Sequence, residues 1–514
     1  MDRTAELAAV FLENVCVDPL SANGPAAHAR RSNTALRMLK RYPEIARHSI
    51  HTAVVCGEVE EVERILAEHP EAVSEPGGPL RKRRRSELNK LWTPLLHLCY
   101  SRLPLAVASD NAIALARLLL DRGANPNDYF EVGDGPHRYT ALCGVAGEGE
   151  DDAPPHAQRN ALARLLLDRG ADPYDMQLFY NTHFHGDILW ILEPMYESAA
   201  KSGRPFNSDP EWSGINNGGY GHGARFLLTE AIVNNNLELA EWLLKHGASP
   251  NAAPAPHPNH PKHSLHEDAL RRGSIEIAEL LVRYGATPSQ FVRDGVDAFT
   301  DVCLRLDENE ARAVIAEHPE YLHSTIPIFT AAKRDRADVV ALLLDLGTPI
   351  EIADESQVRP LHVASYSNAL NVAQLLIDRG ADLEAVESTW GNTPLGFATY
   401  ANMKSMIELI SKHSTDVYRL TWTGNIERLK EVLNAQPELA KLNDGSTPLM
   451  WLPDDDVRAM EAVKLLVGFG ADLAVKSEQG LTAADYARKW ALYDTADLLE
   501  LDRINTTDKM DPSK

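Results

Sequence analysis

The sequence predicts an all-α protein: a solenoid of roughly 12–13 helix pairs, with hairpin fingers and inserted loops. Three observations support this fold class. The chain is too long for one core, one helix-ending phrase recurs along it, and a helix-starting phrase precedes most copies. It has 514 residues, whereas a single hydrophobic core stops growing at roughly 250–300 residues. The chain must therefore form several domains or a repeat array.

The helix-ending phrase consists of apolar residues, a charged pair and then Gly-Ala. It reads LLLDRGA at residues 118–124 and again at 165–171. Further copies reach the same point at Gly247, Gly285, Gly347, Gly380 and Gly470. Apolar residues at this spacing bury one face of a helix. Glycine then adopts the left-handed conformation that ends the helix. The phrase therefore predicts the end of a core-packed helix in each copy.

The helix-starting phrase precedes most copies by about 20 residues. It reads TPL at residues 93–95, 393–395 and 447–449, and RPLHVA at 359–364. A threonine or serine caps a helix N-terminus, and proline fits the first turn. Each unit is thus predicted to be a turn, a short helix, a second turn and a longer helix.

These two phrases resemble the ankyrin repeat, whose motif is T-P-L-H-x-A followed by G-x-x-x-[IV]-[VA]-x-x-L-L-x-x-G-A. The match is strongest at residues 264–286, 359–381 and 392–413, and weaker forms cover most of residues 40–500. The resemblance implies a protein-binding solenoid that works through its hairpin tips and concave groove. It also implies that His266 and His362, in the histidine position of the motif, hydrogen-bond between neighbouring loops.

The units are not equally regular. We expect an N-terminal helical cap at residues 1–48, irregular repeats with long inserts at 49–265, more regular repeats at 266–502 and a tail at 503–514. Some units end in Pro-Glu instead of Gly-Ala, at residues 43–44, 70–71, 319–320 and 437–438. Inserts are expected at 127–139, 200–222 and 252–263. Inserts in repeat arrays often lie on the binding face, but tolerated variation in loop length would look the same.

The amino-acid composition limits the classes of partner that this chain is expected to bind. The formal net charge is −23, from 51 basic and 74 acidic residues. This balance makes broad binding to nucleic acid or an anionic membrane unlikely, because both need a positive surface. No apolar run approaches the roughly 20 residues of a membrane span. Five cysteines without CxxC spacing indicate reduced thiols. We expect a cytoplasmic monomer without a cofactor.

The histidine-rich region 183–263 raises an enzyme or metal-site alternative. Residues 183–187 read HFHGD, like the H-x-H-x-D signature of metallo-β-lactamases. We reject that interpretation because Ile188 stands where the next histidine should be. The weak metal-ligand candidates are His183, His185, His222, His257, His260 and His263. Imidazoles bind zinc and copper, but the spacing is loose and surface histidines explain it better. The basic run at residues 81–85 could dock nucleic acid, an acidic protein or a nuclear import receptor, although a solvated loop is the simpler interpretation.

Aligning the short helices on the T-P-L-H phrase places aromatic residues on one face in successive units. The candidate groove residues are Tyr366, Phe397, Tyr400, Trp422, Trp451, Tyr486 and Trp490, with Val363, Arg419 and Lys489 beside them. Aromatic residues anchor recognition because they bury much area with few rotors. The alternative is that these rings pack between neighbouring helices. Trp390 is a separate candidate at a hairpin tip.

The sequence therefore favours a non-catalytic scaffold or adaptor that binds a protein or peptide. Two alternatives remain open: an enzyme or metal-binding protein that uses the inserts, and a secreted effector that targets a host protein.

Overall fold

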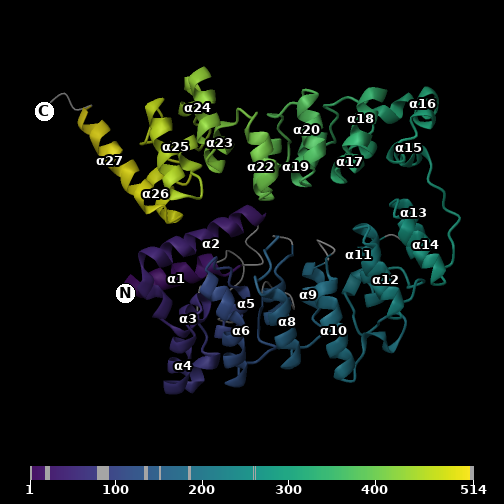
Figure 1. Ribbon diagram of the computed structural model, residues 1–514, viewed down its shortest axis with the longest axis horizontal. Helices are drawn as coiled ribbons and strands as arrows, with labels where there is room; N and C mark the ends of the chain where they lie inside the picture. Colours follow the sequence, from purple (N-terminus) through teal and green to yellow (C-terminus); the bar gives the residue numbers. More distant parts are fainter. Residues whose placement is uncertain are drawn as a thin grey trace. The chain divides into compact units, whose positions relative to one another are not determined.

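The computed structural model describes residues 3–17, 24–77, 92–131, 137–149, 152–182, 187–258, 260 and 262–509. In these ranges the chain forms 27 α-helices, seven 3-10 helices and one two-stranded hairpin (Figure 1). It divides into two compact units. The N-terminal unit comprises Met1–Gly24 and Arg31–Arg293, and the C-terminal unit comprises Pro25–Arg30 and Asp294–Lys514.

The N-terminal unit is built from short and long helices in alternation. Its helices are α1 (Arg3–Val15), most of α2 (Gly24–Arg41), α3 (Ile50–Cys56), α4 (Val59–Glu68), α5 (Pro94–Tyr100), α6 (Ala106–Asp121), α7 (Ala141–Ala146), α8 (Arg159–Asp168), α9 (Met176–Thr182), α10 (Leu189–Lys201), α11 (Gly223–Val233), α12 (Leu237–Lys245), α13 (Leu265–Arg271) and α14 (Ile275–Arg283). The expected finger at 127–139 contains strands β1 (Tyr129–Glu131) and β2 (Arg138–Thr140), which pair antiparallel.

The C-terminal unit repeats the same alternation with fewer interruptions. Its helices are α15 (Gly295–Leu304), α16 (Glu308–Glu317), α17 (Thr325–Lys333), α18 (Ala337–Leu346), α19 (Pro360–Tyr366), α20 (Leu370–Asp378), α21 (Pro394–Tyr400), α22 (Lys404–Ser411), α23 (Val417–Thr423), α24 (Ile426–Ala435), α25 (Asp456–Gly468), α26 (Ala483–Lys489) and α27 (Tyr493–Lys509).

Short helices pack on short helices and long helices on long ones, which makes two layers in each unit. In the C-terminal unit α15, α17, α19, α21 and α23 follow one another in contact, and α18, α20 and α22 form the second layer (Figure 1). The core between the layers is aliphatic, with Leu343, Leu376 and Leu395 fully buried. This arrangement confirms the predicted all-α solenoid of stacked helix pairs.

The helix ends are those that the repeated phrases predict. All seven glycines of the helix-ending phrase have positive φ, from 82° at Gly380 to 111° at Gly347. At the other end, the side chains of Ser264, Thr93 and Thr393 each accept a hydrogen bond from a backbone N–H of the first turn. Both signals act within a few residues, which is why sequence reasoning located them correctly.

Units that end in Pro-Glu close in a different way. In each, the proline starts a five-residue 3-10 helix: Pro43–Arg47, Pro70–Ser74, Pro319–His323 or Pro437–Lys441. The residue before the proline has a negative φ and is not left-handed, with φ −130° at His318. Proline thus stops the long helix where glycine stops it elsewhere.

One predicted short helix is absent. The phrase at residues 447–449 forms only a single 3-10 turn, Pro448–Met450, and Trp451 stands at its end. The interpretation that placed Trp451 on a helix is wrong. Pro453 provides the physical reason, because its ring disfavours helical geometry at Leu452.

The insert at 200–222 is packed against the repeat frame. Phe206, Trp212 and Ile215 are fully buried. Tyr196 of α10 and Trp242 of α12 contribute rings to the same cluster, 5.5 Å apart and edge to face. Much of this insert is therefore a structural wedge between two repeats.

The motif histidines link neighbouring loops, as the resemblance implies. The Nε2 atom of His362 lies 3.0 Å from the Ala385 carbonyl oxygen, and its Nδ1 atom accepts from the Arg359 backbone N–H. The Nδ1 atom of His266 accepts from the Ser289 backbone N–H.

Candidate functional site

The predicted aromatic stripe divides into two parts. In the first, which we name the exposed half, Tyr366 of α19 and Tyr400 of α21 are 47% and 41% exposed. Phe397 is half-buried; its ring lies edge-on to Tyr366 at 6.2 Å and to the buried His362 ring at 5.2 Å. These are favourable aromatic contacts. Packing therefore fixes Phe397, while the two tyrosines present ring surface to solvent.

Trp390 lies at the tip of a finger between α20 and α21 and is 74% exposed. The finger is held by Glu387, which is 1% exposed. Its carboxylate accepts from the backbone N–H groups of Thr389, Trp390 and Asn392 at 2.6–2.9 Å. Burial alone would raise the pKa of this carboxyl, but the three N–H groups hold it below the ordinary value. A rigid turn thus presents a large apolar side chain to water.

The second part, the filled half, runs from α23 to α26. Trp422 and Trp451 meet edge to face at 6.1 Å. The Arg419 guanidinium lies 4.9 Å from the Trp451 ring and donates to the Asn392 side-chain oxygen. Burial lowers the pKa of Arg419, and the nearby Asp416 carboxylate opposes that shift. Cations and indoles therefore alternate along this half, an arrangement that the ring quadrupole favours.

Residue 30 completes the filled half. The Arg30 guanidinium lies 4.3 Å from the Trp422 ring and 4.7 Å from the Trp490 ring. Its NH1 group donates to the Leu452 carbonyl oxygen at 2.8 Å, and the side chain is 2% exposed. We name the two indoles and this carbonyl the arginine cage. The segment Pro25–Arg30 that supplies the arginine belongs to the same compact unit as the cage.

The last predicted groove residues lie beside the cage. The Tyr486 hydroxyl hydrogen-bonds the Ser477 hydroxyl at 3.2 Å. The Lys489 ammonium lies 5.3 Å from the Trp490 ring and 6.0 Å from the Tyr486 ring. Val363, by contrast, is 7% exposed and belongs to the core. The structure thus brings most of the predicted residues together, in two sets with different surroundings.

The geometry can be compared with known proteins. Models of ankyrin repeats match residues 226–253 and 307–421. The chain carries ankyrin repeats. A serine/threonine-protein kinase of Arabidopsis thaliana is 36% identical over 90 residues, 18% of this chain and 20% of the kinase. The B-cell lymphoma 3 protein homolog of Mus musculus is 28% identical over 107 residues, 20% of this chain and 24% of that protein.

An ankyrin repeat protein of Fowlpox virus is 25% identical over 178 residues, 34% of this chain and 46% of the viral protein. The chain thus spans between a fifth and a half of the length of these relatives. The matched repeats include α19 and α21, which carry the exposed half of the aromatic stripe.

The candidate metal ligands that the structure describes belong to the N-terminal unit. His183, His185 and the basic run 81–85 lie outside the described residues. His257 and His260 lie 5.3 Å apart, and Tyr220 contacts His260 at 4.9 Å. His263 pairs with Glu267 at 3.1 Å. Within the described ranges, no group of three or more histidine, cysteine or acidic residues is placed to hold a metal ion.

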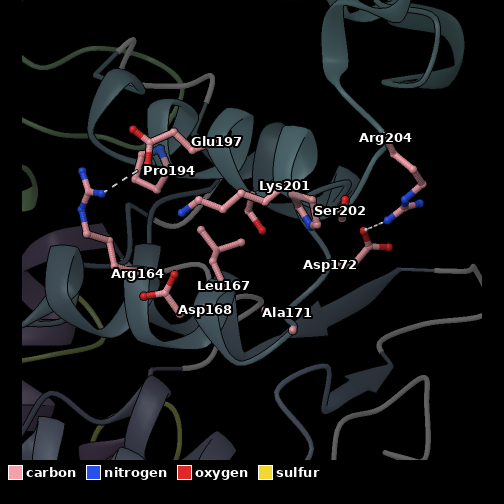
Figure 2. Close-up of a pocket in the computed structure, with 13 residues that line it drawn as sticks. Arg164, Leu167, Asp168, Ala171, Asp172, Pro194, Glu197, Lys201, Ser202 and Arg204 are labelled. Atoms are coloured by element: carbon pink, nitrogen blue, oxygen red, sulfur yellow. Dashed lines mark hydrogen bonds and ion pairs between the residues drawn. The ribbon is translucent and has the colours of Figure 1, made fainter.

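A hollow of about 510 Å³ lies between the long helices α8 and α10 of the N-terminal unit (Figure 2). Ion pairs cross it at two places, Arg164 with Glu197 at 3.8 Å and Arg204 with Asp172 at 2.9 Å. Both pairs are exposed, so each contributes little to stability. The lining mixes both charge signs and does not select one class of ligand.

Among the residues that the structure describes, no helix is both long and apolar enough to cross a bilayer.

Sequence reasoning did not identify two residues that shape the candidate site, Glu387 and Arg30. Glu387 could have been suspected from its place before a Trp-Gly tip, since a carboxylate often collects turn N–H groups. Arg30 gave no signal, because a contact with Leu452 joins residues 422 positions apart in the sequence.

Proposed function

We propose that this chain is a non-catalytic ankyrin-repeat scaffold or adaptor that binds a protein or peptide in the cytoplasm. The contact surface is the exposed half of the stripe together with the Trp390 finger. The observation that carries the proposal is that Tyr366, Tyr400 and Trp390 are each more than 40% exposed on neighbouring repeats. Large aromatic residues at solvent are the usual anchors of protein recognition.

The rigidity of this surface supports the proposal. Tyr366 and Tyr400 sit on helices, and the Glu387 carboxylate holds the finger that carries Trp390. A surface that is ordered before binding loses little conformational entropy when a partner docks. The net charge of −23 favours a basic partner over nucleic acid. We expect the chain to act as a monomer, which light scattering on the purified protein can measure.

The kinase relative does not alter this proposal, because the match covers 90 residues and only a fifth of that protein.

The test is affinity capture with the full chain followed by quantitative mass spectrometry. A Trp390→Ala/Tyr400→Ala double variant should lose its main partner by about thirtyfold, the effect of truncating an aromatic anchor. Tyr284→Ala is the matched control, because Tyr284 is 39% exposed but lies on the N-terminal unit. Equal capture by the double variant and the control would refute the proposal.

A further inference from the structure

The arginine cage is built for one chemical group. Two indole rings contact the Arg30 guanidinium at 4.3 Å and 4.7 Å, and the Leu452 carbonyl accepts one of its N–H groups. A guanidinium is flat, permanently charged and able to stack while it donates in a fixed direction. Lysine offers neither the flat face nor the fork of donors. The cage is therefore selective for arginine by its shape and by its acceptor.

The carbonyl in the cage lies at a break in the repeat, where no regular short helix forms. The short helix that other repeats possess is reduced here to Pro448–Met450, and Leu452 follows it directly before Pro453. Leu452 is 1% exposed, and Arg30 donates to its oxygen. A buried carbonyl requires such a donor, because leaving it unpaired is costly. The irregularity of this repeat thus creates the acceptor.

The Arg30 side chain in the cage is supplied by a helical turn that is rich in small residues. Residues 24–30 read GPAAHAR, and Arg30 follows Ala26, Ala27 and Ala29 at the start of α2. Short side chains let a helix approach closely while one long side chain enters the cage. Six residues, Pro25–Arg30, make up the part of this segment that belongs to the C-terminal unit.

From these contacts we propose that the arginine cage is a peptide-binding site and that Arg30 occupies it in cis. The partner is a protein that presents an arginine from a helical turn flanked by small residues, and it displaces Arg30 when it binds. A tethered segment holds such a site with little intrinsic affinity, because its effective concentration is high. The acidic excess of the chain attracts a basic competitor. This site is separate from the Trp390 finger and does not depend on it.

The test uses the full chain and a fluorescein-labelled peptide that copies residues 24–36, followed by fluorescence anisotropy. An Arg30→Ala protein should bind this peptide about tenfold more tightly than wild type, because its tethered competitor is gone. Arg31→Ala is the matched control: Arg31 is the neighbouring arginine, but it donates to the Glu13 carbonyl outside the cage. The control should bind as wild type does.

Two further arms identify the cage as the site. Adding Trp490→Ala to Arg30→Ala should abolish the gain. Replacing the arginine of the peptide that corresponds to Arg30 by citrulline, which keeps the shape and loses the charge, should weaken binding about tenfold. Equal binding by Arg30→Ala and Arg31→Ala, or undiminished binding by the double variant, would overturn the proposal.

Folding is checked by circular dichroism and thermal unfolding before each titration. If Arg30→Ala does not fold, Arg30→Gln replaces it, because glutamine can still donate to the Leu452 carbonyl. If neither variant folds, wild type is titrated with the arginine and citrulline peptides. A preference for arginine supports the cage, and equal affinity contradicts it.

Discussion

The exposed and filled halves of the aromatic stripe have similar sequences and different surroundings. Tyr400 at one repeat is 41% exposed, whereas Trp422 at the next contacts Trp451 and the guanidinium of Arg30. Each ring stands near the end of a short helix, Tyr400 on α21 and Trp422 on α23. The difference teaches that position within a repeat does not decide what a side chain does. What lies against it decides, and that can come from a distant part of the chain.

The largest effect on stability should appear when one aromatic ring is removed from each half and the two losses are compared. Trp422→Ala should lower the free energy of unfolding by about 3 kcal/mol, because a packed indole and its contacts are lost. Tyr400→Ala should cost less than about 1 kcal/mol, because much of that ring is already in water. Urea denaturation measures both. Equal losses would mean that the division into two halves is wrong.

The next effect on stability concerns Arg30, whose guanidinium lies in the filled half. Arg30→Ala should lower the free energy of unfolding by about 2 kcal/mol, from two lost cation–π contacts and an unpaired Leu452 carbonyl. Tryptophan fluorescence should shift as well, because Trp422 and Trp490 lose a neighbour. An Arg30→Ala protein with unchanged stability and emission would show that the cage does not hold Arg30.

A smaller effect distinguishes the halves by pH. Burial lowers the pKa of His362, whose ring contacts Phe397 of the exposed half, below the ordinary histidine value of about 6.5. The fold therefore holds the neutral ring, and its contribution is complete above pH 6.5. It is lost as the pH falls through the lowered folded-state pKa, since the unfolded chain then binds more protons. Between pH 7.5 and 5, wild type should therefore lose more of its free energy of unfolding than His362→Gln does. Equal pH slopes in urea denaturation would contradict this.

The smallest effect on stability is expected at the finger. Trp390→Ala should change the free energy of unfolding by no more than about 0.5 kcal/mol, because the side chain is 74% exposed. Glu387→Gln should cost more, since it weakens the acceptor for three backbone N–H groups. Thermal unfolding of both variants gives the comparison. A reversed order would show that Trp390 packs against the fold.

The local features of the repeats could be predicted from the sequence. Gly347 and Gly380 end helices in the left-handed conformation, and Thr393 caps one, because each signal acts over a few residues. The motif also predicts a helix at Trp451. That helix does not form, because Pro453 disfavours helical geometry at the residue before it. The exposure of Trp390 was also predicted, since it precedes a glycine at a turn.

The sequence by itself determined the periodic frame and the helix ends. These follow from hydrophobic spacing and capping, which are encoded within each repeat. Only the tertiary structure decided that Trp422 and Trp490 contact the guanidinium of Arg30. The physical reason is that Arg30 reaches the cage across almost the whole length of the chain, and no local pattern records a contact between residues so far apart.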